Sequence, residues 1–412
     1  MKKTPALLIS AILLFIPLIQ VQANDRNNFI DETQIQNIYN KYSEHLDSKY
    51  FAEQDTWLFA APTYGYKEWT FAYTPRNLMS FATFYKYKAI DGDTLAIEKI
   101  DKSINMAINW QKIDDRKIYS FDGAIANFLI VRMIEQVPDS LTYKEIENFN
   151  LFINYHLPKA LEADDTENRA ALAAVYWFYC AKYLENNGFE ITDDIYKKID
   201  EKMQKSMNET ISKDFLYREN NQQDFSLHYH VLQAYLMSIY GDWTKNLGTV
   251  VSAREMTKNF RHLTFNNGLL ETSFGKRPTG ANAQTYLMAG LLSKRFKYLD
   301  YSIYWQYLSD DTFFSDLENP NRLEWHSTYL ENKNIFHDDY SFANIAELAL
   351  SADLFTNFST AAMPEKIDNQ GIYNYSTFWI HNNSDQIVFI NRRSDEIKKI
   401  KLIGSGKQTA SF

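Results

Sequence analysis

Apolar residues recur along most of this 412-residue chain at spacings of three and four, which is the period of an amphipathic helix. In residues 77–89, for example, Leu78, Phe81 and Tyr85 fall on one helical face. Asp93 precedes the next periodic segment and is a residue type that often caps a helix N-terminus. The pattern predicts helices over residues 35–46, 77–89, 94–110, 121–135, 143–155, 168–184, 193–210, 226–240, 250–263, 283–296, 298–308 and 340–354.

Short polar turns join these segments, and little strand signal lies between them. Successive helical hairpins favour a toroid or solenoid of helix pairs. No repeated sequence motif accompanies the hairpins, so a compact all-α bundle is the structural alternative. The expected fold is therefore mainly α, an incomplete (α/α) toroid of helical hairpins with a short β-rich C-terminal tail.

The pattern changes after about residue 364. Residues 372–380 are aromatic and partly alternating, residues 382–385 have the composition of a turn, and residues 386–390 are apolar. These features predict a hairpin, with a third strand over residues 397–403. Because so small a β segment cannot form a full sandwich, we expect it to dock on the helical body or on a partner.

The N-terminus carries the three parts of a secretory signal, which are Lys2 and Lys3, an apolar run over residues 6–19, and a small residue, Ala23, after which we expect cleavage. No later segment is long and apolar enough to span a bilayer. The mature protein is expected to be soluble, in the periplasm or secreted, without membrane association. The predicted domains are a signal peptide at residues 1–23, a helical catalytic toroid at 24–363 and a β-rich segment at 364–412.

Composition narrows the functional classes. The formal net charge is −9, which argues against a nucleic-acid partner because such a partner requires a basic face. Aromatic residues make up 16% of the chain, and aromatic faces suit the C–H faces of sugar rings, although helical cores also use Phe and Tyr. The single cysteine, Cys180, lies in an apolar helical segment and is predicted to be a core residue.

A polar cluster occupies residues 224–230, where a loop is expected to meet a helix. Histidine and tyrosine side chains in such a place can transfer protons at a carbon or at a glycosidic oxygen. Hydrogen-bonded structural histidines and packed tyrosines are the alternative interpretation. The side chains concerned are His228, Tyr229, His230, Tyr235 and Tyr240.

A second candidate, Asn168, opens a long apolar helix after an acidic turn. An amide there could hydrogen-bond a substrate carboxylate while a cation pairs with the same group. Neutralising the carboxylate makes the neighbouring C–H proton more acidic, so a histidine or tyrosine could remove it in a β-elimination. A helix N-cap is the alternative role for Asn168.

Two further segments hold possible sugar-binding side chains. The loop at residues 271–282 contains Lys276 and Arg277, which could hold an acidic sugar; it lacks the spacing of a phosphate loop, and a plain surface turn is the alternative. A segment rich in Trp and Tyr ends at Arg76, just before a predicted helix. A sugar ring could stack on its aromatic side chains, which are Trp57, Tyr64, Tyr66 and Trp69. Packing of these side chains in the core is the alternative.

Taken in order, these segments resemble the toroid polysaccharide lyases that act on hyaluronate, chondroitin and xanthan. The similar features are a Trp-rich segment ending in Thr-Pro-Arg at residues 69–76, an Asn at a helix start at 166–168, and a Ser and a His within 224–230 followed by two tyrosines. A loop at 273–282 that runs to Ala-Asn completes the series. The resemblance spans roughly residues 57 to 300.

The resemblance implies that Asn168 neutralises the carboxylate, that His230 helps to abstract the proton, and that Tyr240 acts as base or acid. Tyr240 lies one residue further from His230 than in the family pattern, so Tyr235 or Tyr229 could hold the tyrosine role. His228 and Arg76 are expected near the bound sugar.

The chain departs from the family elsewhere. Phe274 stands where the family has an arginine, so Lys276 or Arg277 would replace it, and Phe225 replaces a glycine. The family also continues into large β-sandwich domains, of which this chain carries only the beginnings.

The expected function is cleavage of an acidic, uronic-acid-containing polysaccharide by β-elimination, with no cofactor. A glycoside hydrolase would instead need two carboxylates across a cleft, with Asp224 and either Glu167 or Asp311 as candidates. A glycan-binding protein without activity is the third possibility, which Phe274 favours. At residues 337–339 a capped helix start is favoured over a metal site. The polymer and the oligomeric state stay open.

Overall fold

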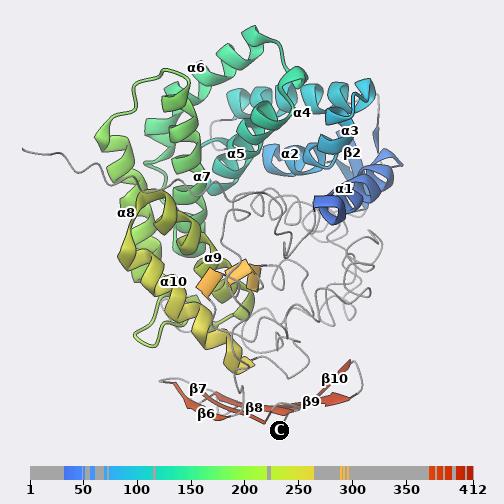
Figure 1. Cartoon of the computed structure of the whole chain (residues 1–412). Helices are drawn as coiled ribbons and strands as arrows, with labels where there is room; N and C mark the ends of the chain where they lie inside the picture. The colour runs from blue at the N-terminus through green and yellow to red at the C-terminus, as the bar shows by residue number, and fades with distance from the viewer. Residues whose placement is uncertain are drawn as a thin grey trace, which may run out of the picture.

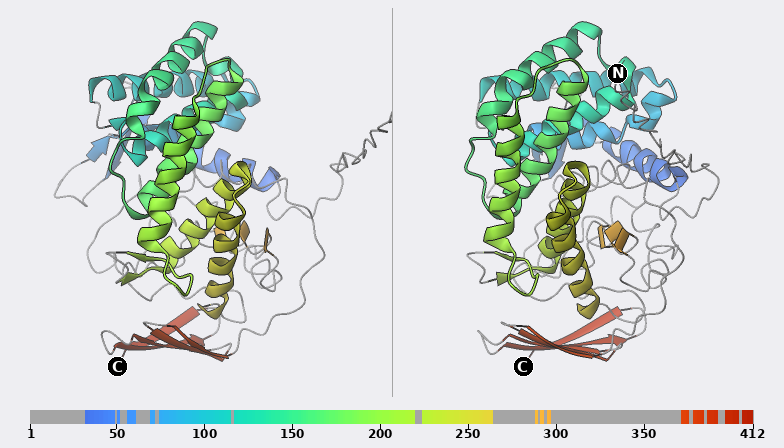
Figure 2. Two further views of the ribbon diagram at one scale, coloured as in Figure 1. Left: turned by 90° about the vertical axis from the view of Figure 1, so that its left-hand side faces the viewer. Right: turned by 60° about the vertical axis from the view of Figure 1, so that its left-hand side comes forward.

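The computed structural model describes residues 32–48, 50–51, 56–60, 69–71, 74–114, 117–219, 224–263, 288–289, 291–292, 295–296, 371–375, 378–383, 386–391, 396–403 and 406–411. The described part is mainly helical, as the hydrophobic periodicity predicts. Its helices follow an arc from α1 through α6 and α8 to α10, and a C-terminal sheet lies beyond the end of α10 (Figures 1 and 2). The helices are α1 (Glu32–Asp47), α2 (Pro75–Thr83), α3 (Lys86–Ile90), α4 (Thr94–Ile113), α5 (Phe121–Gln136), α6 (Tyr143–Ala160), α7 (Glu167–Asn186), α8 (Asp193–Thr210), α9 (Leu227–Thr244) and α10 (Leu247–Phe260), with 3-10 turns η3 (Pro138–Ser140) and η4 (Arg261–Leu263).

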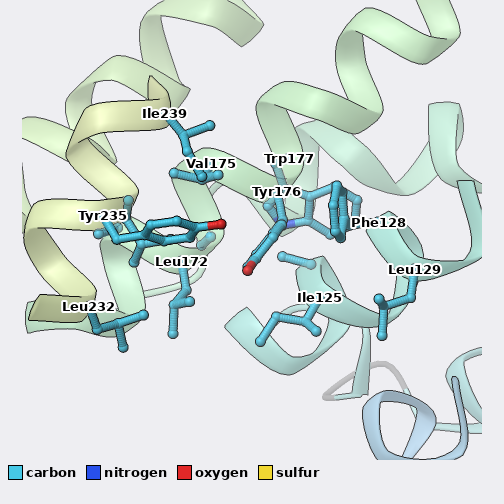
Figure 3. Packing of buried hydrophobic residues seen from close by; sticks show 14 of the residues in the cluster. Ile125, Phe128, Leu129, Leu172, Val175, Tyr176, Trp177, Leu232, Tyr235 and Ile239 are labelled. Carbon is cyan, nitrogen blue, oxygen red and sulfur yellow. The ribbon is translucent and has the colours of Figure 1, made fainter. Parts of the chain in front are cut away.

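The helices form an inner and an outer layer. Helices α2, α5, α7 and α9 are buried on nearly all sides, which is the pattern of helices enclosed by other protein. Helices α4, α6, α8 and α10 bury one face and expose the other. The core between α5, α7 and α9 contains Phe128, Tyr176, Trp177 and Tyr235 (Figure 3).

Most predicted helices match the structure within a few residues, and Asp93 caps α4 as expected by accepting from the N–H groups of Leu95 and Ala96. One prediction is wrong in a specific way, because the segment at 77–89 is not one helix. It breaks after Thr83 into α2 and α3, and the Tyr85 hydroxyl at the break donates to Asp47 at 2.9 Å. The predicted helices at 298–308 and 340–354 lie outside the described residues, as does most of the one at 283–296.

Two small sheets contradict the expectation of little strand between the helices. Strands β1 (Tyr50–Phe51), β2 (Thr56–Ala60) and β3 (Trp69–Phe71) form an antiparallel sheet, and β4 (Arg218–Glu219) pairs with β5 (Asp224–Phe225). Strands of two to five residues are too short to show an alternating pattern.

The C-terminal segment forms a five-stranded antiparallel meander in the order β10-β9-β8-β7-β6. The segment predicted as one strand at 372–380 is a hairpin of two, and the strand predicted at 397–403 is β9. The strands are β6 (Gly371–Asn374), β7 (Phe378–Asn382), β8 (Gln386–Asn391), β9 (Glu396–Ile403) and β10 (Gly406–Ser411).

The sheet docks on the helical body at η4, which confirms one of the two expected positions. The His262 ring stacks on Tyr373 with centroids 3.3 Å apart and hydrogen-bonds the Tyr375 hydroxyl. The Asn382 amide donates to the His262 carbonyl oxygen at 3.1 Å. One buried histidine therefore joins the end of the helical arc to the sheet.

Cys180 is fully buried in α7, as predicted for a core residue, and burial raises the pKa of its thiol. Among the helices that the structure describes, none combines the length and the apolar character needed to cross a membrane.

We expect Gly123→Ala to destabilise the protein. A Cβ at Gly123, in the first turn of α5, would lie 2.7 Å from the backbone carbon of Ile118 and closer still to its oxygen. Overpacking against backbone costs about 1–3 kcal/mol, so the free energy of unfolding in urea should fall by that amount. Gly248→Ala in α10 is the matched control, because its nearest neighbour would be Asn246 Oδ1 at 3.4 Å. An unfolding free energy unchanged in Gly123→Ala would contradict this packing.

Candidate active site at the amino ends of the inner helices

The inner helices begin at one end of the molecule, and side chains from neighbouring helices meet there. Arg76 of α2 donates from Nη1 to Asp122 Oδ1 of α5 at 3.1 Å. The Arg169 guanidinium of α7 lies 5.6 Å from the ring centroid of Phe121 in α5. First-turn N–H groups and the positive ends of helix dipoles gather at such an end, which makes it suited to anions.

Local sequence sets where three of these helices start. Thr74 Oγ1 accepts from the N–H of Asn77, and Pro75 follows at the first helical position, where it needs no N–H partner. Ser120 and Ser226 cap α5 and α9 in the same way, by accepting from the N–H groups three residues ahead. Hydroxyl caps therefore place the first turns of α2, α5 and α9.

Helix α7 starts differently. Thr166 is its N-cap residue but forms no side-chain cap bond, so Asn168 is not the N-cap and lies partly buried in the first turn. Glu167 has φ 55°, in the left-handed region that residues other than glycine rarely adopt. Its N–H donates to Glu209 Oε2 of α8 at 2.7 Å.

The turn before α7 is fixed by a buried cation. Lys202 Nζ of α8 donates to the Ala163 carbonyl oxygen at 2.6 Å and to Asp165 Oδ2 at 3.0 Å. Burial raises the pKa of Asp165, and Lys202 opposes that rise. This anchor holds the unusual backbone at the start of α7 in place.

A buried tyrosine, Tyr217, occupies the space between the starts of α7 and α9. Its ring centroid lies 5.9 Å from that of Tyr229, and its hydroxyl faces the backbone N–H of Asn168. Burial raises the pKa of Tyr217 far above its ordinary value, and the carboxylates of Glu219 and Glu167 raise it further. The phenol therefore stays protonated and can donate a hydrogen bond, but it cannot serve as a base at neutral pH.

His230 lies beneath this group and is fully buried. Its Nδ1 accepts from the N–H of Tyr217 at 3.1 Å, and its Nε2 lies 2.8 Å from the carbonyl oxygen of Met256. The neighbours thus fix the neutral tautomer with the proton on Nε2, and burial lowers the pKa of His230 to about 4. With both ring nitrogens engaged by backbone, the geometry favours a structural role over the predicted proton abstraction.

Tyr240 lies far from this end. Its hydroxyl donates to Asp200 Oδ1 at 3.2 Å, and its ring packs against Phe178. Ten residues of helix separate it from His230, which is about 15 Å along the axis. The predicted meeting of Asn168, His230 and Tyr240 is therefore not formed.

The other aromatic candidates occupy various positions. Tyr235 is buried on α9 and points towards α7 (Figure 3). Trp57 is fully buried against Phe81 and Tyr85, which is the core-packing alternative. Tyr229 is buried, whereas His228 is partly exposed with its ring 5.1 Å from that of Tyr229. Trp69 lies in β3.

The remaining candidates lie outside the described residues; they are Tyr64, Tyr66, Lys276, Arg277, Asp311 and residues 337–339. Within the described part of the chain, no three or more His, Cys, Asp or Glu side chains form a group that could hold a metal ion.

Sequence reasoning missed Asp122, Tyr217 and Glu219. An acidic residue in the first turn of a helix is ordinary, because it complements the helix dipole, so Asp122 carried no distinct signal. Strand β4 is only two residues long, and its pairing opposite β5 brings Glu219 against Asp224. A search for carboxylates in the first turns of all the buried helices would have found Asp122.

The buried histidine predicts a pH dependence of stability. The pKa of His230 is about 4 when folded and about 6.5 when unfolded, so between these values the unfolded chain binds more protons. Its contribution is complete above about pH 6.5 and is lost as the pH falls towards 4, by up to roughly 1.4 kcal/mol per pH unit. Urea unfolding of the wild type and of His230→Gln, compared at pH 5 and pH 7, isolates this contribution. Equal pH dependence in the two proteins would rule it out.

The chain resembles known proteins in its structure and not in its sequence. No family model matches the chain, and no curated protein matches its sequence. An unsaturated glucuronyl hydrolase specific for heparin matches with a TM-score of 0.50 at 12% identity, over 79% of this chain and 98% of the other. The unsaturated glucuronyl hydrolase of Bacillus sp. GL1, responsible for glycosaminoglycan degradation, gives 0.49 at 11% identity, over 78% and 97%.

A third match is a mutant unsaturated glucuronyl hydrolase from Streptococcus agalactiae complexed with dGlcA-GalNAc6S, with a TM-score of 0.49 at 10% identity, over 78% and 91%. At such low identities the likeness concerns the fold alone. The predicted architecture is confirmed: this chain has the (α/α) toroid fold found in unsaturated glucuronyl hydrolases.

Proposed function

We propose that this protein is an exported glycoside hydrolase that acts on an acidic, uronic-acid-containing glycan. The observation that carries the proposal is the pair of carboxylates, Asp122 and Glu167, at the starts of adjacent inner helices beside two arginines. The shared fold with glucuronyl hydrolases supports the same reaction class. Export is proposed from the signal-like first 23 residues.

The two carboxylates suit acid–base hydrolysis. Asp122 is the second residue of α5 and Glu167 the first of α7, so both lie at the starts of neighbouring inner helices. Glycosidases use two carboxyl groups roughly 5–9.5 Å apart, and we assign these two side chains to that pair. One carboxyl group would protonate the glycosidic oxygen while the other activates water or attacks the sugar carbon. The Asp122 side chain is 39% exposed, so a substrate can reach it.

Neighbouring groups would bind the sugar. Arg169 is exposed and forms no ion pair with any described residue, so its guanidinium can take the uronate carboxylate in a bidentate pair. The buried Tyr217 would hold the starts of α7 and α9 in place rather than contact the sugar. Asn168, which is partly buried in the first turn of α7, is proposed to bind the substrate, as the sequence predicts, but within a different reaction.

The β-elimination expected from the sequence has less support. It requires a proton acceptor beside the neutralised carboxylate, yet His230 is buried with both nitrogens bonded to backbone groups. Burial and the nearby Asp200 carboxylate raise the pKa of Tyr240, which disfavours the phenolate that a tyrosine base needs.

The products distinguish the two reactions. We expect the purified protein to release new reducing ends from chondroitin, hyaluronate or heparin oligosaccharides without a rise in ultraviolet absorbance, because hydrolysis forms no double bond. With lyase-generated unsaturated disaccharides, release of the unsaturated sugar should lower the absorbance as that ring opens. A rise in absorbance that is lost in Tyr240→Phe would instead establish β-elimination, and the absence of products would leave a binding protein.

Replacing either carboxylate should remove most of the activity. General acid–base groups contribute about 10²–10⁴-fold, so Asp122→Asn and Glu167→Gln should each lower kcat by that range. Thermal unfolding would show that both variants fold. Asp194→Asn is the control, since that carboxylate pairs with Lys198 on the outer helix α8. Full activity in both carboxylate variants would refute the assignment.

A further inference from the structure

A second feature, outside the candidate site, lies where the outer helices α4 and α6 end. We call it the lysine–aromatic surface; its residues are Trp110, Lys112, Lys117, Tyr119, Tyr155 and Lys159. Two contacts join these helices in the same order along both, so they run in the same direction: Asn105 Nδ2 of α4 donates to Glu145 Oε1 of α6 at 3.4 Å, and Lys112 Nζ lies 5.7 Å from the ring centroid of Phe152. Tyr119 lies just before α5 and brings the connecting segment to the same place.

Each lysine of this surface lies against an aromatic ring. Lys117 Nζ is 5.5 Å from the centroid of Trp110, Lys159 Nζ is 4.6 Å from that of Tyr119, and Lys112 Nζ is 5.7 Å from that of Phe152. The three ammonium groups are thus held beside aromatic rings, and cations next to exposed aromatic area are a combination that fits anionic sugars.

The position of the aromatic rings is fixed by hydrogen bonding and packing. The Tyr119 hydroxyl lies 2.8 Å from His156 Nδ1, and the His156 ring packs between Phe152 and Tyr155 at centroid distances of 4.7 and 4.9 Å. A surface whose rings are already held in place loses little conformational freedom when it binds.

The surface is open, and part of its charge is not neutralised. Tyr155 is 78% exposed, and Ile113, the residue after Lys112, is 82% exposed, which leaves apolar area in contact with water. Within the described residues neither Lys112 nor Lys117 forms an ion pair, although the chain as a whole has a net charge of −9. Lys112, Lys117 and Lys159 outnumber the carboxylate of Asp114, which lies between the first two along the chain, and such positive charge on an acidic protein favours an anionic ligand.

We propose that the lysine–aromatic surface is a second binding site, for the sulfate and carboxylate groups of an anionic glycan. Lysine ammonium groups would pair with the anions, and the exposed ring of Tyr155 would contact sugar C–H groups. Helices α4 and α6 end where α5 and α7 begin, so the surface lies at the same end of the molecule as the candidate active site. The class of ligand rests on the proposed function, whereas the site itself rests on the geometry above.

Binding of a chondroitin sulfate octasaccharide to the full-length mature protein tests this proposal. Calorimetry would use the Asp122→Asn background, in which the ligand is not consumed. We expect Lys112→Gln/Lys117→Gln and Tyr155→Ala each to weaken the Kd at least tenfold, and Lys112→Arg/Lys117→Arg to retain it. Raising the salt from 0.05 to 0.3 M should weaken binding by the unmutated surface more than by the double glutamine variant, because salt screens exposed charges.

The matched control is Lys144→Gln/Lys197→Gln, which removes two exposed lysines near the starts of α6 and α8. It should bind as the unmutated surface does. Equal affinity of the lysine–aromatic surface variants and the control variant would overturn the proposal. It would also be overturned if the protein bound no glycan and sedimentation showed self-association that Tyr155→Ala abolishes. If the protein binds the glycan at this surface but cleaves none, only the proposed function is refuted. If it cleaves the glycan but the variants of the lysine–aromatic surface bind as tightly as the unmutated protein, only this site is refuted.

Discussion

Close packing of α7 between α5 and α9 is the constraint on which the rest of the molecule depends. Small residues at the start of α7, among them Ala170, Ala171, Ala173 and Ala174, are buried and let the neighbouring helices approach. Further along, Phe128 of α5 packs against Tyr176 and Tyr179. Helices enclosed on all sides by such contacts cannot slide along one another. The first turns of α5, α7 and α9 therefore stay next to one another at the same end of the helices.

Because the inner helices are aligned in this way, their polar side chains fall into two groups, one at the accessible amino ends and one in the buried core. At the amino ends, Asp122, Arg169 and Glu167 are partly or fully accessible beside the protonated Tyr217. Deeper in the core, His230 and Tyr240 are satisfied by backbone and by Asp200, and these bonds tie helices together. The proposed hydrolysis uses the accessible groups of the first environment, whereas elimination by His230 and Tyr240 would have to use groups of the second.

Hydrophobic spacing alone predicted the helical class, most helix positions and the β-rich tail, because long amphipathic segments have only one stable way to bury their apolar faces. It failed where tertiary contacts decide, as at Tyr85, whose hydroxyl bond to Asp47 accompanies the break between α2 and α3. The site was harder to predict. The sequence singled out Asn168, and its role stays a prediction. Asp122 and Tyr217 have their contacts with residues some 46 and 49 positions away along the chain, and no local pattern encodes those distances.

The backbone at Glu167 has an evolutionary consequence. A left-handed conformation at a glutamate costs about 1–2 kcal/mol, and glycine at that position would relieve the strain. Glycine would also delete the carboxylate. Selection for thermal stability alone would therefore favour glycine at this position, whereas selection for the proposed reaction would favour glutamate, so the two pressures act on residue 167 in opposite directions.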